Sequence, residues 1–157
     1  MSLPPRLHNR HPRSAHLRQP AEFDRCFKDG RRSGSLCFGY VFRRHDQTDI
    51  DAGIRRSRLG LAISRRVDKR AVERNRLRRL VREWFRHNEH RFPAGDLVVS
   101  GRPAARGRDA ARILAELDRL PERLGLPLVD GVGKMPGSPT TSHPSRQPDS
   151  TPSANPQ

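Results

Sequence analysis

The chain of 157 residues is poor in aromatic and cysteine side chains and contains no long apolar run. Aromatic residues make up only 5% of it, so we expect a small core and no large enzyme pocket. The two cysteines, Cys26 and Cys37, are too few for a disulfide framework and lack the Cys-x-x-Cys spacing of zinc sites, which predicts small core residues. No segment approaches the roughly 18 apolar residues of a membrane span or resembles a secretion signal, so we expect a cytoplasmic protein without membrane contact.

Recognisable catalytic motifs are missing as well. The sequence shows no nucleophile elbow and no Cys/His pairing, and residues 30–34 (GRRSG) lack the Lys-Ser/Thr that ends a phosphate-binding loop. Carboxylates are sparse and scattered among arginines, which argues against a two-metal nuclease site. We therefore predict a binding protein with no catalytic and no metal-ligating residues of its own.

Positive charge is what the chain has in excess. The sequence holds 32 Lys+Arg against 17 Asp+Glu, a formal net charge of +15. Residues 55–91 alone contain fourteen basic and four acidic residues, a net +10. Such a cluster predicts a polyanion partner, because phosphate contacts supply most non-specific nucleic-acid affinity. An anionic membrane and a merely solvated charged surface are the alternatives.

Composition divides the chain into three parts. Residues 1–19 are rich in Arg, His and Pro without an apolar period, which predicts a flexible basic arm. Residues 126–157 are rich in Pro, Ser and Thr and nearly free of large apolar side chains, which predicts a disordered tail. The folded domain is expected at 20–125.

Within that domain, apolar spacing and turn residues predict alternating helices and strands. Residues 45–56 are polar and are expected to form a surface loop. An additional strand is expected to be hidden in 36–64. The whole is predicted to be a small single-domain α/β sandwich of order α-β-β-β-α-β-α. The predicted elements are helices at 20–28, 70–90 and 110–120 and strands at 36–44, 58–64 and 96–101.

The helix at 70–90 is the most informative segment. Its apolar residues fall at helical spacing and form one continuous stripe: Leu77, Leu80, Val81, Trp84 and Phe85. At about 100° per residue, the opposite side presents Asn75, Arg79, Arg82 and Arg86, with Arg76 and Arg78 on its flanks. Asn is a poor helix former, so Asn75 is expected to contact RNA or to organise the neighbouring arginines. The helix should cover the sheet with one side and offer cations with the other.

Residues 64–86, SRRVDKRAVERNRLRRLVREWFR, resemble the hallmark of the protein subunit of bacterial ribonuclease P. In that family a Ser-Lys-Lys-like strand end precedes A-V-x-R-N-R-x-K-R-x-x-R-E on a helix. Here Ser64, Arg65 and Arg66 match the strand end, and Arg replaces Lys throughout. The helix matches at Ala71, Val72, Arg74, Asn75, Arg76, Arg78, Arg79, Arg82 and Glu83.

The resemblance implies a fold and a function. The fold is a central sheet with a left-handed strand-helix-strand crossover, ribosomal protein S5 domain 2-like. The function is to bind the catalytic RNA and to assist removal of the 5′ leader from precursor tRNA. One protein is expected to bind one RNA, and these complexes could assemble further into a larger holoenzyme. The RNA subunit cleaves the precursor tRNA, and the Mg²⁺ that this reaction needs is bound mainly by the RNA. The RNA-facing residues implied are Arg65, Arg66, Lys69, Arg70, Arg74, Asn75, Arg76, Arg78, Arg79, Arg82 and Arg86.

The same resemblance implies a cleft between the first helix and the sheet that receives the single-stranded leader. Its predicted residues are Phe23, Phe27 and Tyr40, because unpaired bases stack on aromatic rings. Two other functions stay open at this point. One is a structural RNA-binding protein of ribosomal type without a substrate, and the other is a DNA-binding protein, for which no helix-turn-helix or dimer zipper is visible.

Overall fold

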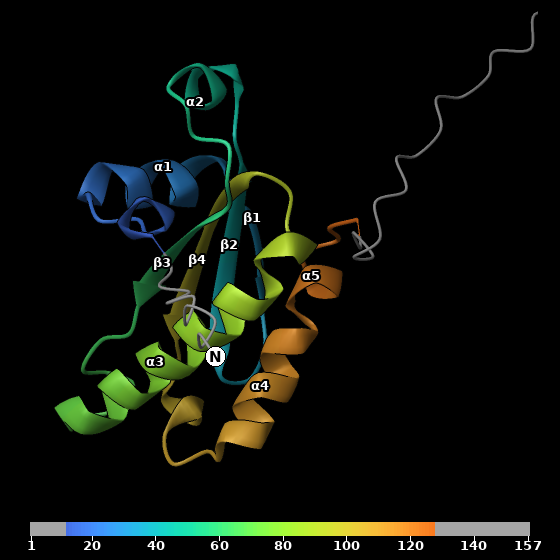
Figure 1. Ribbon diagram of the computed structural model, residues 1–157. Helices are drawn as coiled ribbons and strands as arrows, with labels where there is room; N and C mark the ends of the chain where they lie inside the picture. Colours follow the sequence, from blue (N-terminus) through green and yellow to red (C-terminus); the bar gives the residue numbers. More distant parts are fainter. Residues whose placement is uncertain (1–11, 128–157) are drawn as a thin grey trace, which may run out of the picture.

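A mixed sheet of four strands forms the centre of the protein (Figure 1). The computed structural model describes residues 12–127. The two middle strands are antiparallel, and the last two are parallel. Across the sheet the order is β1 (Arg31–Gly34), β2 (Phe38–Arg44), β4 (Gly95–Gly101) and β3 (Arg58–Ala62).

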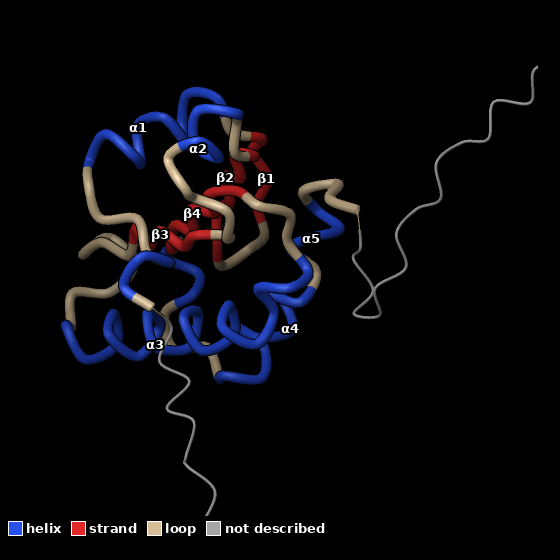
Figure 2. The backbone as a smooth tube through the Cα atoms, turned by 45° about the horizontal axis from the view of Figure 1, so that its top comes forward, coloured by secondary structure: helices blue, strands red, loops and turns tan. Residues whose placement is uncertain are grey.

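Helices cover both faces of this sheet. Figure 2 shows two of them on one face, α3 (Ala71–Asn88) and α4 (Ala110–Asp118), with α5 (Leu120–Arg123) following α4. On the other side lie α1 (Pro20–Asp29) and the short α2 (Gln47–Asp51). The α/β class and the predicted order of the main elements are confirmed.

Two predictions about local structure were wrong. The additional strand expected within 36–64 lies before that range, where residues 31–34 form β1, and the predicted loop at 45–56 contains α2. The cause of the second difference is a capping box: the Asp46 carboxylate accepts a hydrogen bond from the Asp49 N–H, and the Asp49 carboxylate accepts one from the Asp46 N–H.

The crossover from β3 through α3 to β4 is left-handed, as the resemblance implied. In Figure 1 both strands run downward, β4 lies to the right of β3, and α3 crosses in front of them. Parallel strand pairs connected this way are rare, because about 98% of such connections are right-handed. The handedness places the start of α3 beside the outer edge of β3.

The larger core lies between the sheet and the pair α3 and α4. The predicted apolar stripe of α3 faces it, and Leu77, Val81 and Phe85 are at most 1% exposed. The Trp84 indole N–H donates a 2.7 Å hydrogen bond to the Asp118 carboxylate at the end of α4, which links the two helices. Burial of this stripe determines which side of α3 faces outward.

The α1 face of the sheet has a smaller core. Cys26 of α1 is buried against Val41 and Val98, with Leu17 beside them. A Cβ on Gly60 would lie 2.8 Å from the Phe23 ring, so only glycine allows α1 to approach β3 this closely. Cys37 is buried on the other face, so the prediction of two small core cysteines is confirmed.

The predicted arm at 1–19 is only partly described. Residues 12–19 are not a free arm: Ala15 and Leu17 are buried, and the Leu17 N–H donates a 3.0 Å hydrogen bond to the Leu59 carbonyl of β3. Residues 1–11 and most of the predicted tail, 128–157, lie outside the described residues. Helices of the described part are all too short or too polar to cross a membrane.

Candidate nucleic-acid interface

The outward side of α3 is cationic, as its spacing predicted. Asn75, Arg79 and Arg82 are exposed, and Arg86 is half-buried on the same side, next to Glu83. Neither Arg79 nor Arg82 forms an ion pair or a side-chain hydrogen bond with any described residue. Their guanidinium groups are therefore available to an external anion.

Three other arginines of α3 are tied to the backbone of neighbouring loops. Arg74 donates to the Lys69 carbonyl at 2.7 Å, Arg76 to the Arg108 carbonyl at 3.0 Å, and Arg78 to the Ile63 carbonyl at 2.8 Å. All three are half-buried. The carbonyl groups bound by Arg76 and Arg78 belong to distant segments that the tertiary fold brings close, whereas Arg74 binds the turn directly before α3.

Asn75 organises one of these arginines. Its side-chain oxygen accepts a 3.1 Å hydrogen bond from Arg78, one turn further along α3. Of the two roles expected for Asn75, the structure confirms this one. Since its side chain is exposed, its amide N–H groups still face outward.

The loop before α3 adds further cations beside the helix start. Arg65, Arg66 and Lys69 are exposed and their charged groups have no partner within residues 12–127. The buried Asp68 carboxylate receives hydrogen bonds from Arg70, which hold the pKa of Asp68 below its ordinary value. Asp68 thus stays charged and fixes Arg70 at the first turn of α3.

Beyond α1, the sheet presents a row of small residues. The strand register aligns Gly39 of β2 with Ser100 of β4 and Ser100 with Ala62 of β3. All three are half-exposed, whereas Val41 and Val98 in the next row lie buried beneath α1. This row forms an open floor at the carboxyl ends of the two parallel strands.

Cations border that floor at the strand ends. A hollow of about 660 Å³ is lined by Ala62 and Ser100 together with Arg66, Arg78 and Arg102. Arg102 was not among the predicted site residues. It follows β4 as Arg65 and Arg66 follow β3, and the ends of parallel strands meet at one edge of a sheet, so this signal was present in the sequence.

Phe23 and Phe27 of α1 lie on the same face as this floor. Both are half-buried and pack against the small core under α1. The structure therefore brings these two predicted cleft residues to the face that carries the open row.

The prediction for Tyr40 was wrong. Tyr40 is 1% exposed and belongs to the core on the opposite face, where its hydroxyl lies 3.0 Å from the Ser35 hydroxyl. Burial raises the pKa of Tyr40 to about 12. Its neighbour Val41 points toward α1 instead, because successive side chains of a strand alternate between the two faces.

The carboxylates near this surface are already engaged by arginines. Asp68 is bound by Arg70, and Glu83 by Arg86. No group of three or more His, Cys, Asp or Glu side chains suited to a metal ion occurs among the described residues. The side chains at this surface do not fit a Mg²⁺ site on the chain.

Comparison with known proteins gives one consistent family. The family model described as ribonuclease P matches residues 11–125. The ribonuclease P protein component of Thioalkalivibrio sulfidiphilus is 43% identical over 120 residues, which cover 76% of this chain and 93% of that protein. The corresponding protein of Xanthomonas oryzae pv. oryzae is 37% identical over 137 residues, 87% of this chain and 88% of the relative.

Solved structures give the same match. The RNase P protein from Thermotoga maritima is similar with a TM-score of 0.56 and 30% identity, covering 67% of this chain and 93% of that one. A structure of the Staphylococcus aureus RNase P protein gives a TM-score of 0.61 at 24% identity, covering 69% and 93% of the two chains, and supports the fold alone.

Proposed function

The chain belongs to the ribonuclease P protein family, and we propose that it binds the catalytic RNA through α3 and the preceding loop and the precursor-tRNA leader through the α1 face of the sheet. It acts as a subunit of an endoribonuclease that processes tRNA, with ribonuclease P RNA as its partner. Family membership disfavours the alternative of a ribosomal-type protein without a substrate role.

The observation that carries the RNA-binding proposal is the set of unpaired cations in the loop before α3 and along the outward side of that helix. Arg65, Arg66, Lys69, Arg79 and Arg82 are exposed and lack acidic partners within the described part of the chain. Like charges held this close repel one another, and phosphates that approach them release condensed counterions. The surface is therefore most favourable when RNA covers it.

The leader is proposed to lie on the open floor beside α1. Phe23 and Phe27 offer ring edges for unpaired bases, and Arg66 and Arg102 lie where a phosphate backbone would pass. Because the floor residues are small, the single-stranded RNA leader can approach the sheet closely. Stacking combined with phosphate contacts is the usual way proteins bind single strands without strong sequence preference.

We assign no catalytic residue to the protein. Because its carboxylates near the surface are paired with arginines, we propose that the RNA holds the Mg²⁺ and performs the cleavage. We further propose one protein per RNA, in the cytoplasm, with the residues of α3 that are tied to backbone carbonyls serving to hold the RNA-facing surface in shape.

Reconstitution tests the proposed function. The chain is combined with ribonuclease P RNA from a bacterium that carries one of the relatives above, and precursor-tRNA cleavage is measured at low Mg²⁺ with and without protein. We expect faster cleavage at low Mg²⁺ with the protein present. Equal rates across the Mg²⁺ series would refute the proposal.

A matched pair of variants localises the effect. Arg79→Ala with Arg82→Ala removes two unpaired cations of α3, and we expect loss of RNA affinity with unchanged stability. Arg112→Ala with Arg119→Ala removes the same charge from exposed residues of α4 and of the turn directly after it and should retain full affinity. Equal loss in both pairs would mean that only the net charge of the chain matters.

A further inference from the structure

The segment before α1 is fixed against the outer edge of the sheet. A bridge joins His16 to Leu59, and the Leu17 N–H donates to the Leu59 carbonyl at 3.0 Å. The side chains of Ala15 and Leu17 are buried. The backbone that carries Arg13, His16 and Arg18 is therefore held along β3.

This fixed segment and α3 form the two walls of a groove. A hollow of about 430 Å³ is lined by Arg13, His16 and Arg18 from the segment and by Arg78 and Arg82 from α3. Within residues 12–127, no acidic side chain lines this hollow. The guanidinium groups of Arg13, Arg18 and Arg82 have no ion pair or hydrogen bond with the rest of the described chain.

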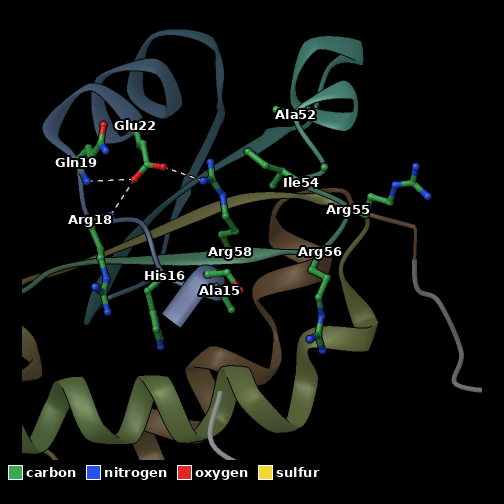
Figure 3. A pocket seen from close by; sticks show the side chains of 12 residues that line it. Ala15, His16, Arg18, Gln19, Glu22, Ala52, Ile54, Arg55, Arg56 and Arg58 are labelled. Carbon is green, nitrogen blue, oxygen red and sulfur yellow. Dashed lines mark hydrogen bonds and ion pairs between the residues drawn. The ribbon is translucent and has the colours of Figure 1, made fainter. Parts of the chain in front are cut away.

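The groove continues toward the start of β3. His16 and Arg18 also line the adjoining hollow, and Arg56 lines that hollow and the next one, which reaches Arg86. In Figure 3 the side chains of His16, Arg18 and Arg56 point to the side where α3 runs, whereas Arg55 points away. Basic side chains therefore follow the whole outer edge of β3.

The two acidic residues along this path are occupied. Glu22 accepts hydrogen bonds from the N–H groups of Arg18 and Gln19 and pairs with Arg58 at 2.8 Å. Glu89 lies 3.2 Å from Arg56. Glu89 thus pairs with Arg56 at one end of the groove, whereas Arg13, Arg18 and Arg82, which line its central hollow, form no ion pair with a described residue.

We propose that this β3-edge groove, formed by residues 13–18, Arg56 and the facing side of α3, holds a second stretch of the catalytic RNA's sugar-phosphate backbone. The inference rests on the proposed function. Opposed arginines without acids attract a polyanion strongly, and their planar groups bind phosphate oxygens in pairs. Arg82 belongs both to this groove and to the outward side of α3, so the same RNA can run from one to the other.

The groove suits backbone contacts better than base contacts. Its floor is aliphatic, with Leu17, Leu59 and Leu61, and the ring of Phe23 is packed over Gly60. Phe23, at the border with the leader floor, is the one aromatic residue of the described chain that lines the central hollow of the groove, and no pair of amide groups lines it to recognise base edges, so binding depends mainly on charge and shape. This distinguishes the groove from the leader floor on the α1 face.

The first experiment measures affinity of the full chain for ribonuclease P RNA over a salt series. Arg13→Ala with Arg18→Ala should weaken binding about tenfold and reduce the slope of log affinity against log salt by about 1.4, two contacts at about 0.7 each. The control pair on α4, Arg112→Ala with Arg119→Ala, should leave both unchanged. An unchanged slope for the groove pair, or the same loss in the control pair, overturns the proposal.

A second experiment identifies the occupant. Ser14 is exposed beside the groove, and both native cysteines are buried, so Ser14→Cys accepts a tethered iron-EDTA group while every groove arginine remains. In the assembled holoenzyme with precursor tRNA, we expect hydroxyl-radical cleavage of the catalytic RNA. Cleavage confined to the leader overturns the proposal.

Failure of the groove and failure of the proposed function give different results. If unmodified protein fails to bind the RNA at all, the proposed function is wrong. If unmodified protein binds and stimulates cleavage while the groove pair behaves like the control, only the β3-edge groove is wrongly assigned.

Discussion

The two faces of the sheet are held together by different chemistry. Among the described residues, nineteen buried apolar residues form one continuous core toward α3 and α4, whereas four form the core under α1. The α1 face instead carries a buried charged row, in which Asp96 of β4 lies between Arg43 of β2 and Arg58 of β3. Apolar burial stabilises one face, and ion pairing aligns the other.

This difference bears directly on function. Arg58 also pairs with Glu22 in the first turn of α1, and Arg43 pairs with the buried Asp49 of α2 at 2.7 Å. The charged row therefore positions α1 and α2 at one end of this face, and few buried apolar residues are needed there. The other end stays open over Gly39, Ser100 and Ala62, where we place the leader.

The largest effect expected from this comparison concerns the apolar face. Phe85 is fully buried, and its ring centre lies 5.8 Å from that of Phe92. Phe85→Ala removes a large side chain from a packed core, which costs about 3–5 kcal/mol of unfolding free energy. Denaturant unfolding of the unmodified chain and of the Phe85→Ala variant measures this loss of unfolding free energy.

The matched control is an apolar side chain outside the core. Leu36 is 60% exposed, and Leu36→Ala should change the unfolding free energy by less than about 0.5 kcal/mol. If the two substitutions cost the same, the α3 face does not supply most of the stability.

The next effect concerns the charged row. The Asp96 carboxylate accepts hydrogen bonds from Arg58 at 2.8 and 3.0 Å and lies 2.8 Å from the His45 ring nitrogen. Asp96→Asn keeps the shape but leaves buried cations without a counter-charge. Breaking a buried pair in this way costs about 3 kcal/mol, which the same unfolding experiment at pH 7 measures.

The charged row also predicts an acid dependence. Burial by itself raises the pKa of Asp96, but the hydrogen bonds from Arg58 and His45 outweigh it and lower the pKa below its ordinary value. The stability contributed by Asp96 is then complete above about pH 4, the unfolded pKa, and is lost as the pH falls through the lower folded pKa.

Unfolding measured between pH 6 and pH 2 tests the direction. Asp96→Asn should flatten the acid-induced loss of stability, because the group that must be protonated is gone. Asp29→Asn, at an exposed residue that pairs with nothing else in residues 12–127, should retain the normal acid dependence. If both variants lose stability less steeply as the pH falls, the acid dependence comes from the net charge of the chain and not from Asp96.

Local periodicity was sufficient to predict the main elements and the two sides of α3. The positions of Leu77, Val81 and Phe85 determine which side is buried, and a cationic opposite side follows from 100° per residue. The roles of Arg76 and Arg78 did not follow, because their carbonyl partners at Arg108 and Ile63 lie in distant segments that folding brings close.

The assignment of Tyr40 shows a different limit. Alternation correctly placed Phe38, Tyr40 and Phe42 on one side of β2, but a single strand does not reveal which helix covers that side. These three rings belong to the larger core, which α3 and α4 cover. Arg13 and Arg18 were missed because edge pairing with β3 is a long-range contact.

The smallest expected effect compares one aromatic residue from each face. Phe27→Ala removes a half-buried ring beside the open floor, and loss of one stacking contact should weaken precursor-tRNA binding by the holoenzyme about tenfold, equivalent to about 1.4 kcal/mol. Tyr40→Phe removes only the hydroxyl contact with Ser35 on the opposite face. It should cost about 1 kcal/mol of unfolding free energy and leave precursor binding unchanged.

Binding to precursor and mature tRNA, measured side by side, isolates the leader. Because mature tRNA lacks the leader, Phe27→Ala should weaken precursor binding and spare mature binding. If Tyr40→Phe weakens precursor binding as much as Phe27→Ala does, the leader does not lie on the α1 face. If Phe27→Ala weakens both ligands equally, its ring supports the fold of α1 and not the leader, and the cations at the strand ends remain as the leader contacts.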